Sequence, residues 1–229
     1  LTGSPAHADV GSHSVVITAS DGTASTTDSF TITVANANDA PTITSTAVTS
    51  ATEDAAYTYT VTASDVDGDT LTMTGTTVPS WLSFNAATGV LSGTPLNANV
   101  GTSGNDVVIT VTDGNNGQVT DTFTITVTNT NDAPTITSTA DTTAEEDDAY
   151  SYTVTTSDVD TGDTVTLAGT TVPSWLSFTA GTGVLAGTPA NADVGSHAVV
   201  ITATDSSGAT AVQSFTIVVA NANDAPAVT

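Results

Sequence analysis

The sequence predicts an all-β protein built as a tandem array of seven-stranded antiparallel β-sandwiches. The tetrapeptide Asn-Asp-Ala-Pro occurs three times, and its aspartates, Asp39, Asp132 and Asp224, lie 93 and 92 residues apart. This period fits one small β-domain and is too long for a solenoid turn. Apolar residues alternate with threonines along each repeat, as in half-buried strands. No segment has the periodicity of an amphipathic helix.

The repeat divides the chain into four parts. Leu1 to Gly22 matches Leu185 to Ser206, so the chain begins in the second half of a repeat. About 90 residues can bury one core, whereas a half-repeat cannot. The missing strands are expected from preceding residues of a longer array or, alternatively, from a neighbouring chain in a head-to-tail contact that extends into a filament. The expected parts are a half-repeat at 1–38, complete repeats at 39–131 and 132–223, and the start of another repeat at 224–229.

Strands of the first complete repeat are expected at 42–46, 57–63, 71–77, 89–92, 107–111 and 123–127. Tyr57, Tyr59 and Val61 alternate with threonines, which is the period-two pattern of a half-buried strand. The same alternation recurs in 123–127. The segment 107–111 is more uniformly apolar and is expected to be central in its sheet. About seven short strands favour a two-sheet antiparallel sandwich.

The two tryptophans, Trp81 and Trp175, lie in identical Pro-Ser-Trp-Leu-Ser-Phe segments. Exposed indoles would stack on sugar rings and would indicate a carbohydrate-binding or spacer module of a secreted glycosidase. Buried indoles would instead anchor the core of each repeat. The adjacent leucine and phenylalanine favour burial.

The charge composition restricts the partners. The chain has 24 acidic residues and no lysine or arginine, for a net charge of −24. Such a polyanion repels nucleic acid and anionic lipid, which leaves metal cations as the counter-charge. The absence of cysteine excludes disulfides and thiolate metal sites. No apolar stretch approaches the roughly 18 residues of a membrane span, so no membrane insertion is expected in this segment.

Three sets of polar residues are expected to meet at one end of each sandwich, where the loops after the second and sixth strands face the incoming linker. They are an Asp-x-Asp after the second strand, one aspartate after the sixth strand and an Asn-x-Asn-Asp linker. The carboxylates of an extended Asp-x-Asp point to the same side, as a hard cation requires of its oxygen ligands. The members are Asp65, Asp67, Asp158 and Asp160; Asp113 and Asp205; and Asn36, Asn38, Asp39, Asn129, Asn131, Asp132, Asn221, Asn223 and Asp224.

The opposite end of each sandwich carries a second acidic group. Carboxylates about 4 Å apart repel by roughly 1 kcal/mol in water and by roughly 4 kcal/mol near a protein surface, and a divalent cation would relieve this repulsion. The alternative interpretation is a set of solvated turn aspartates that form Asx-turns. The residues are Glu53-Asp54 or Glu145-Glu146 before the second strand, with Glu53 and Glu145 as the candidate ligands, and Asp9, Asn99 or Asp193 in the Asn-Ala-Asp-Val-like turn.

The order of these motifs resembles cadherin-type repeats, and most closely the dystroglycan-type cadherin-like, Ig-like domains of large bacterial surface proteins. Asp113-Gly114, a last strand and the segment Asn129 to Pro134 are similar to the end of a cadherin repeat. Asp65 and Asp67 resemble its Asp-x-Asp, and Glu53 resembles its glutamate. The resemblance implies Ig/cadherin-like sandwiches with Ca²⁺ between consecutive domains. Asparagine at the first linker position implies fewer or weaker ions.

The sequence therefore predicts a non-catalytic, extracellular array of calcium-stiffened extender repeats in a bacterial surface adhesin or filament, with neighbouring repeats as partners. An enzyme is not expected, because the carboxylates recur in every copy and the three histidines have no serine or cysteine motif around them. The glycosidase-associated module is the alternative. The first calcium junction is expected to use Asn36, Asn38, Asp39, Asp65, Asp67 and Asp113, with Asp9 as a weaker ligand. The second is expected to use Glu53, Asn129, Asn131, Asp132, Asp158, Asp160 and Asp205, and Glu145, Asp193, Asn221, Asn223 and Asp224 are the further candidates.

Overall fold

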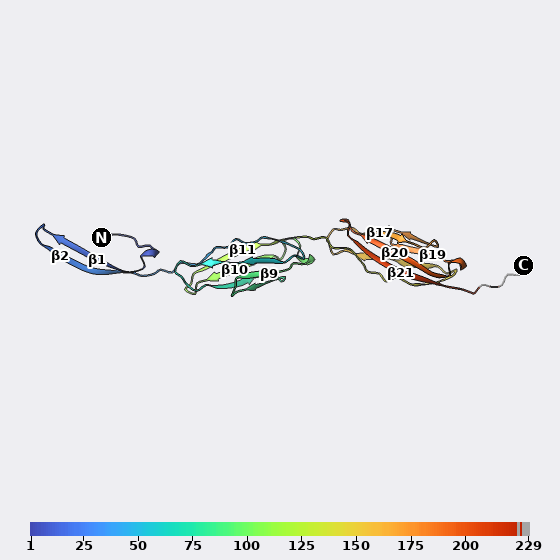
Figure 1. Ribbon diagram of the computed structural model, residues 1–229, viewed down its shortest axis with the longest axis horizontal. Helices are drawn as coiled ribbons and strands as arrows, with labels where there is room; N and C mark the ends of the chain where they lie inside the picture. The colour runs from blue at the N-terminus through green and yellow to red at the C-terminus, as the bar shows by residue number, and fades with distance from the viewer. Residues whose placement is uncertain (224, 226–229) are drawn as a thin grey trace. The chain divides into compact units, whose positions relative to one another are not determined.

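The computed structural model describes residues 1–223 and residue 225. The chain divides into two compact units, Leu1–Thr128 and Asn129–Thr229. Each unit contains one β-sandwich, and the first unit also carries the hairpin of β1 and β2 (Figure 1). The predicted all-β fold is confirmed, while the four predicted domain boundaries stay a prediction.

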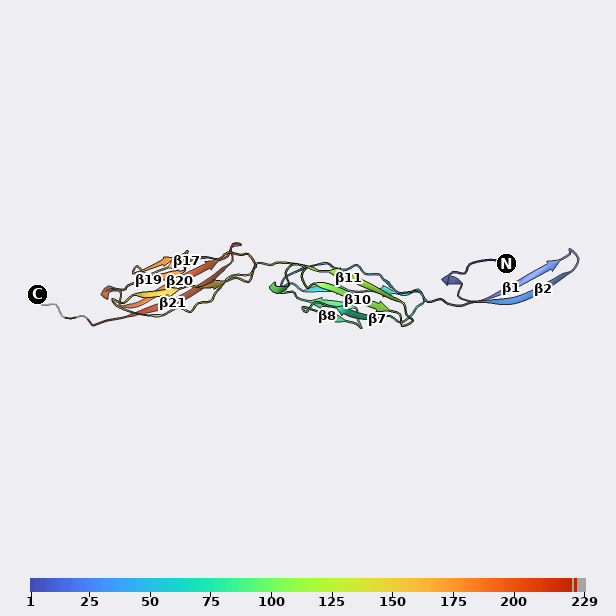
Figure 2. The same ribbon diagram turned by 180° about the vertical axis from the view of Figure 1, so that it is seen from behind.

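The first unit holds two layers of short strands. One layer has the order β11-β10-β7, and the other has the order β5-β9-β8. Figure 2 labels β7, β10 and β11 of the first layer and β8 of the second. Two smaller pairings, β3 with β6 and β12 with β4, complete the sandwich. The elements are η1 (His7–Asp9), β1 (Gly11–Ser20), β2 (Ser25–Val34), β3 (Thr42–Ile43), β4 (Ser50–Thr52), β5 (Tyr57–Thr60), β6 (Ala63–Ser64), β7 (Thr72–Thr77), β8 (Leu82–Asn85), β9 (Val90–Gly93), η2 (Asn97–Asn99), β10 (Asp106–Thr112), β11 (Gln118–Thr124) and β12 (Thr126–Thr128).

The second unit repeats this plan. One layer has the order β14-β21-β20-β17, the other β15-β19-β18, and β13 pairs with β16. The elements are β13 (Thr135–Ile136), β14 (Thr143–Glu145), β15 (Tyr150–Thr153), β16 (Thr156–Ser157), β17 (Thr166–Thr171), β18 (Leu176–Thr179), β19 (Val184–Gly187), η3 (Asn191–Asp193), β20 (Gly195–Thr204) and β21 (Thr210–Ala220).

Three details differ from the predicted strands. The segment 57–63 is interrupted after β5, and the N–H of Val61 donates to Gly89 instead of to a regular ladder partner. The segment 123–127 spans two elements, because β11 pairs antiparallel with β10 whereas β12 pairs parallel with β4. The strand β8, which pairs antiparallel with β9, is not among the predicted ranges.

The core of each sandwich is apolar at its centre and aromatic at its rim. In the first unit Leu91, Ile109 and Ile125 are fully buried. Tyr57 packs edge-on against Trp81 with ring centroids 5.7 Å apart, and its hydroxyl donates to the backbone oxygen of Val48 at 2.7 Å. Burial raises the pKa of Tyr57 to about 12. Both tryptophans pack against their hydrophobic cores, so the core-anchor interpretation is the better one.

The hairpin of β1 and β2 lacks the strands that cover the matching hairpin of β20 and β21. Ile17 is 49% exposed, whereas its counterpart Ile201 is fully buried. Phe30 pairs with Val15 in the same register that places Phe215 opposite Val199. The apolar face of the hairpin is therefore open among the described residues, and the source of its missing strands stays a prediction.

Asn105 is a buried polar link that the two units do not share. Its Oδ1 accepts the indole N–H of Trp81 at 2.9 Å, and its Nδ2 donates to the backbone oxygens of Asn99 at 2.8 Å and Gly101 at 3.1 Å. In the second unit His197 bonds to the oxygen of Asp193, and the indole N–H of Trp175 has no partner among the described residues.

We expect Asn105→Ala to lower the free energy of unfolding of the first unit by about 2–3 kcal/mol, because it leaves a buried indole N–H and two backbone oxygens without their bonds. Urea denaturation followed by tryptophan fluorescence measures the change. Thr120→Ser, at an exposed position of β11, is the control and should change the value by less than about 0.5 kcal/mol. An equal effect of both variants would contradict a structural role for Asn105.

Candidate metal centre

The Asp-x-Asp segment of the first unit forms a tight carboxylate cluster directly after β6. The N–H of Asp67 donates to Asp65 Oδ1 at 2.8 Å, and Gly68 follows with a φ of 77°. This Asx-type turn brings in a further carboxylate, so that Asp65, Asp67 and Asp69 each offer an oxygen within 4.8 Å of the others. The prediction that Asp65 and Asp67 share one side is consistent with this geometry. Asp69 was not among the predicted ligands, although it stands in the same Asp-x-Asp-Gly-Asp run.

The linker is bonded to this cluster. The N–H of Asp39 donates to Asp67 Oδ2 at 2.7 Å, and the Asn38 amide donates to Asp113 Oδ2 at 2.8 Å. The backbone donor of Asp39, followed by the side chain of Asn36, lowers the pKa of Asp67. The structure thus brings together the linker, the Asp-x-Asp and Asp113.

Asp113 closes β10 and is held by its own turn. Its Oδ1 accepts the N–H groups of Asn115 at 2.7 Å and Gly117 at 2.9 Å. The amide of Asn38, followed by these backbone donors, lowers the pKa of Asp113, so the group is an anion at neutral pH. In the present arrangement a Cβ at position 117 would lie 1.9 Å from Asp113 Oδ2, whereas the equivalent position of the second unit is Ala209, whose N–H donates to Asp205 Oδ1 at 2.8 Å.

The second unit repeats these contacts. The N–H of Asp132 donates to Asp160 Oδ2 at 2.7 Å, and the Asn131 amide donates to Asp205 Oδ2 at 2.9 Å. The Asn131 amide is also the main cause of the lowered pKa of Asp205. Here the three carboxylates with oxygens within 4.8 Å of one another are Asp158, Asp163 and Asp205.

Several carboxylate oxygens in these clusters are shielded from solvent and accept no hydrogen bond from the described residues. They are Asp65 Oδ2 and Asp67 Oδ1 in the first unit, and Asp158 Oδ2 and Asp163 Oδ2 in the second. A buried anionic oxygen without a donor is costly. Because the chain has no lysine or arginine, the oxygen clusters fit a hard cation supplied from outside.

The glutamate at the other end of the sandwich is Glu53 in the first unit and Glu146 in the second. Both are 2% exposed, and their N–H groups donate to the equivalent strand-end oxygens of Thr128 and Ala220. Glu145, which the sequence analysis selected, is exposed on β14. The repeat period of 93 residues, counted from Glu53, leads to Glu146 and could have identified it.

The other candidates are placed as follows. The side chains of Asp9, Asn99 and Asp193 cap their own short turns by accepting the N–H groups of Ala6, Leu96 and Ala190. In the first unit His7, which was not predicted, lies with Asp39 and Asp67 in place of Asp9. Glu53 belongs to the first unit and the rest of its predicted junction to the second, so their grouping stays a prediction. The side chain of Asn221 donates to Ala222, Asn129 and Asn223 stay predicted ligands, and Asp224 lies outside the described residues.

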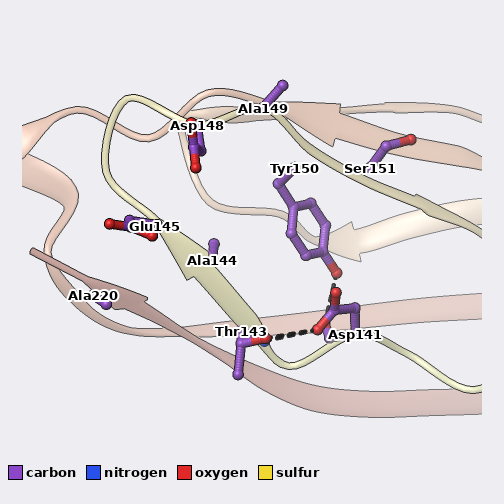
Figure 3. A pocket seen from close by; sticks show the side chains of 9 residues that line it. All are labelled: Asp141, Thr143, Ala144, Glu145, Asp148, Ala149, Tyr150, Ser151 and Ala220. Carbon is purple, nitrogen blue, oxygen red and sulfur yellow. Dashed lines mark hydrogen bonds between the residues drawn. The ribbon is translucent and has the colours of Figure 1, made fainter. Parts of the chain in front are cut away.

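An acidic pocket beside β14 is separate from these clusters (Figure 3). Asp141, Glu145 and Asp148 line it around Tyr150, whose hydroxyl donates to the backbone oxygen of Asp141 at 2.7 Å. Thr143 donates to the Asp141 carboxylate. The corresponding pocket of the first unit carries Val48, Thr52 and Ala55, so this acidity is not a property of the repeat.

A model of the family described as "Putative Ig domain" matches residues 40–128 and 133–220. Among solved structures, "PcdhgB3 EC1-4" is 20% identical over 93% of this chain and 58% of its own, with a TM-score of 0.61. "Protocadherin Gamma B2 extracellular cadherin domains 1-5" is 20% identical over 94% of this chain and 47% of its own, with a TM-score of 0.56. These likenesses show the Ig/cadherin-like fold, which agrees with the predicted resemblance.

An endo-fucoidan hydrolase of glycoside hydrolase family 107 is 24% identical over 96% of this chain, which spans 35% of the hydrolase chain. Its TM-score of 0.39 is too low to support an argument about this protein. No match is found among curated protein sequences. Within the described residues, no helix has the length and apolar character needed to cross a membrane.

We expect Gly117→Ala to displace the Asp113 carboxylate, because the added methyl group would overlap Oδ2. The N–H bonds of Asn115 and Gly117 to that carboxylate should weaken, and amide hydrogen exchange at both positions should accelerate. Gly181→Ala is the control, since nothing lies within 4 Å of a Cβ at that position. Unchanged exchange in Gly117→Ala would contradict the close approach.

The Asn38→Ala variant should raise the pKa of Asp113 toward its ordinary value of 3.8. A lowered pKa stabilises the fold above the unfolded-state value, and this stabilisation is lost as the pH falls through the folded-state value. The stability difference between the wild type and Asn38→Ala should therefore be largest near neutral pH and shrink below pH 3.8. Carboxyl ¹³C titration by NMR measures the pKa, and Asp205 in the other unit is the internal control. A pKa of Asp113 that stays as low as in the wild type would rule out Asn38 as the main cause.

Proposed function

The chain belongs to the Putative Ig domain family, and from this premise we propose that it is a non-catalytic, extracellular structural array whose repeats are stiffened by calcium. Its setting is a bacterial surface adhesin or filament. The observation that carries this proposal is a set of buried carboxylate oxygens at the linker end of both units that accept no hydrogen bond from the described residues: Asp65 Oδ2, Asp67 Oδ1, Asp158 Oδ2 and Asp163 Oδ2.

The repeated construction favours a structural role over a catalytic one. The contact of Asp39 with Asp67 recurs as Asp132 with Asp160 at the same distance of 2.7 Å. The amide contact of Asn38 with Asp113 recurs as Asn131 with Asp205. A catalytic centre needs one constellation of matched acid and base groups, whereas a function of the junctions needs the same constellation in every repeat.

Calcium supplies a hard dication that takes six to eight oxygen ligands at about 2.3–2.6 Å. The donors in the first unit are Asp65, Asp67 and Asp69. Asp39 and Asn38 hold the linker against Asp67 and Asp113 through their own hydrogen bonds. An ion that neutralised the carboxylates would remove their mutual repulsion and strengthen the attachment of the linker to the sandwich.

The ligand chemistry supports an extracellular setting. Extracellular modules bind calcium with dissociation constants of about 10⁻⁴ to 10⁻³ M, so they are occupied only where calcium is abundant. The net charge of −24 keeps the surface soluble and repels nucleic acid. We take neighbouring repeats of the same protein as the partners, including a head-to-tail contact in a filament.

The carbohydrate-binding alternative is less well supported. Trp81 packs edge-on against Tyr57, and Trp175 packs edge-on against Tyr150 with ring centroids 5.9 Å apart. Both indoles are partly buried and packed against the hydrophobic cores. A sugar platform requires an exposed indole face, so these side chains serve the core in preference to a ligand.

We expect calcium binding with millimolar to submillimolar affinity when the calcium-free chain is titrated in a calorimeter. The paired variant Asp67→Asn with Asp160→Asn removes one carboxylate charge from each unit and should weaken binding by about tenfold or more. Asp28→Asn, at an exposed position of β2, is the control and should bind as the wild type does. A flat trace for the wild type up to several millimolar calcium would overturn the proposal.

Chelation of calcium should loosen the repeats relative to one another more than it unfolds them, because the core residues Leu91 and Ile109 are fully buried and apolar. Circular dichroism should keep its β-sheet signal while small-angle scattering shows a broader distribution of end-to-end lengths. The variant with Asp67→Asn and Asp160→Asn should show that broader distribution even with calcium. An unchanged distribution on chelation would count against calcium as the stiffening agent.

A further inference from the structure

The η1 turn places an imidazole against the carboxylate cluster of the first unit. His7 Nδ1 lies 3.1 Å from Asp67 Oδ1. His7, Asp39 and Asp67 each offer one ligand atom, and these three atoms lie within 4.8 Å of one another. One nitrogen and two carboxylate oxygens therefore converge at this point.

The imidazole is particular to the first copy of the repeat. The turn reads His7-Ala-Asp in the first copy, Asn97-Ala-Asn in the second and Asn191-Ala-Asp in the third. His7 is not needed to build the turn, because all three copies form the same short 3-10 element. The substitution changes the donor from an amide oxygen to an imidazole nitrogen.

The side chain of the carboxylate that faces His7 is buried, and one of its two oxygens accepts no hydrogen bond from the described residues. The side chain of Asp67 is only 2% exposed. Its Oδ2 accepts the N–H of Asp39, whereas its Oδ1 accepts no hydrogen bond from the described residues and has the His7 nitrogen as its neighbour. Asp65 Oδ2, in the same cluster, is also shielded and accepts no hydrogen bond within residues 1–223 and 225. A shielded anionic oxygen needs a positive partner, and a cation held jointly by this oxygen and the imidazole nitrogen would supply one.

We propose that His7 Nδ1, Asp39 and Asp67 Oδ1 form a site for a borderline divalent transition-metal ion, with Zn²⁺ as its representative. This inference rests on the proposed function, since Asp67 serves both sites. Under this proposal the first junction binds a transition-metal ion, whereas the clusters that offer only oxygen ligands bind calcium.

The donor chemistry selects the ion. Calcium takes oxygen ligands, whereas neutral imidazole is a preferred ligand of zinc, nickel and copper. Three protein ligands with a water molecule in the remaining position form a usual open zinc site. Two donors each about 2.0–2.1 Å from one ion, at tetrahedral or octahedral angles, are about 2.9–3.4 Å apart. The observed separation of 3.1 Å between His7 Nδ1 and Asp67 Oδ1 lies within this range.

The test uses the full chain and NMR of its imidazole nitrogens. The sequence has three histidines, His7, His13 and His197, so the ring signals are few enough to assign. Titration with zinc chloride should shift the Nδ1 resonance of His7 and leave those of His13 and His197 in place. Both His13 and His197 contact a backbone oxygen of their own turn through Nε2, which makes them internal controls. Zinc that shifts none of the rings, or all of them equally, would overturn the proposal.

The His7→Asn variant restores the residue of the other two copies. His7 is 41% exposed, so its replacement should leave the fold intact, and the amide spectrum checks this. Zinc affinity should fall by about tenfold or more, while calcium affinity should stay the same or rise because the amide adds an oxygen donor. His13→Asn is the matched control and should bind zinc as the wild type does. Equal zinc affinity of His7→Asn and the wild type would refute the role of His7.

A calcium titration of the same samples separates the two proposals. If calcium binding releases or absorbs heat but zinc does not shift the His7 resonance, the zinc site is refuted and the calcium proposal stands. If zinc shifts the His7 resonance but calcium titration gives no heat, the zinc site is supported and the calcium proposal is refuted.

Discussion

The shortage of hydrogen-bond donors is the constraint on which the arrangement of both units depends. The sequence has 24 acidic residues and no lysine or arginine, so each carboxylate must bond to backbone N–H groups, amides and hydroxyls. The N–H of Asp39 on Asp67 and the Asn38 amide on Asp113 meet this need and also attach the linker to the sandwich. The same donors lower the pKa of Asp67 and Asp113, which keeps both groups anionic.

The two units share some side-chain hydrogen bonds and differ in others. The bonds between the linker and the carboxylates are kept in both. The hydrogen bond to the tryptophan indole is not kept. Asn105 accepts the indole N–H of Trp81, whereas the indole N–H of Trp175 has no hydrogen-bond partner in the part of the chain that the structure describes. The turn position of His7 varies in the same way. The bonds between linker and carboxylates that both units share are consistent with a function that resides in the junctions.

Sequence patterns predicted much of this arrangement because they are local. Alternating apolar residues and threonines identify strands wherever one strand face is buried. The failures occurred where a long-range contact decides the outcome. The segment 123–127 divides between two partners, β10 and β4, and β8 forms because β9 is available to pair with it. Alternation within one segment contains no information about such partners.

By itself the sequence determined the repeat, the β-sandwich class, the polyanionic character and the motifs that supply the carboxylates, because composition and period are properties of the chain alone. Only the tertiary structure decided which carboxylates meet. It brought Asp69 and Asp163 into the clusters and placed His7 beside Asp67. It also showed that Glu146 is the buried glutamate of the second unit that corresponds to Glu53 in the first. The physical reason is that ligand groups form from loops distant in sequence, and their convergence depends on strand pairing and burial.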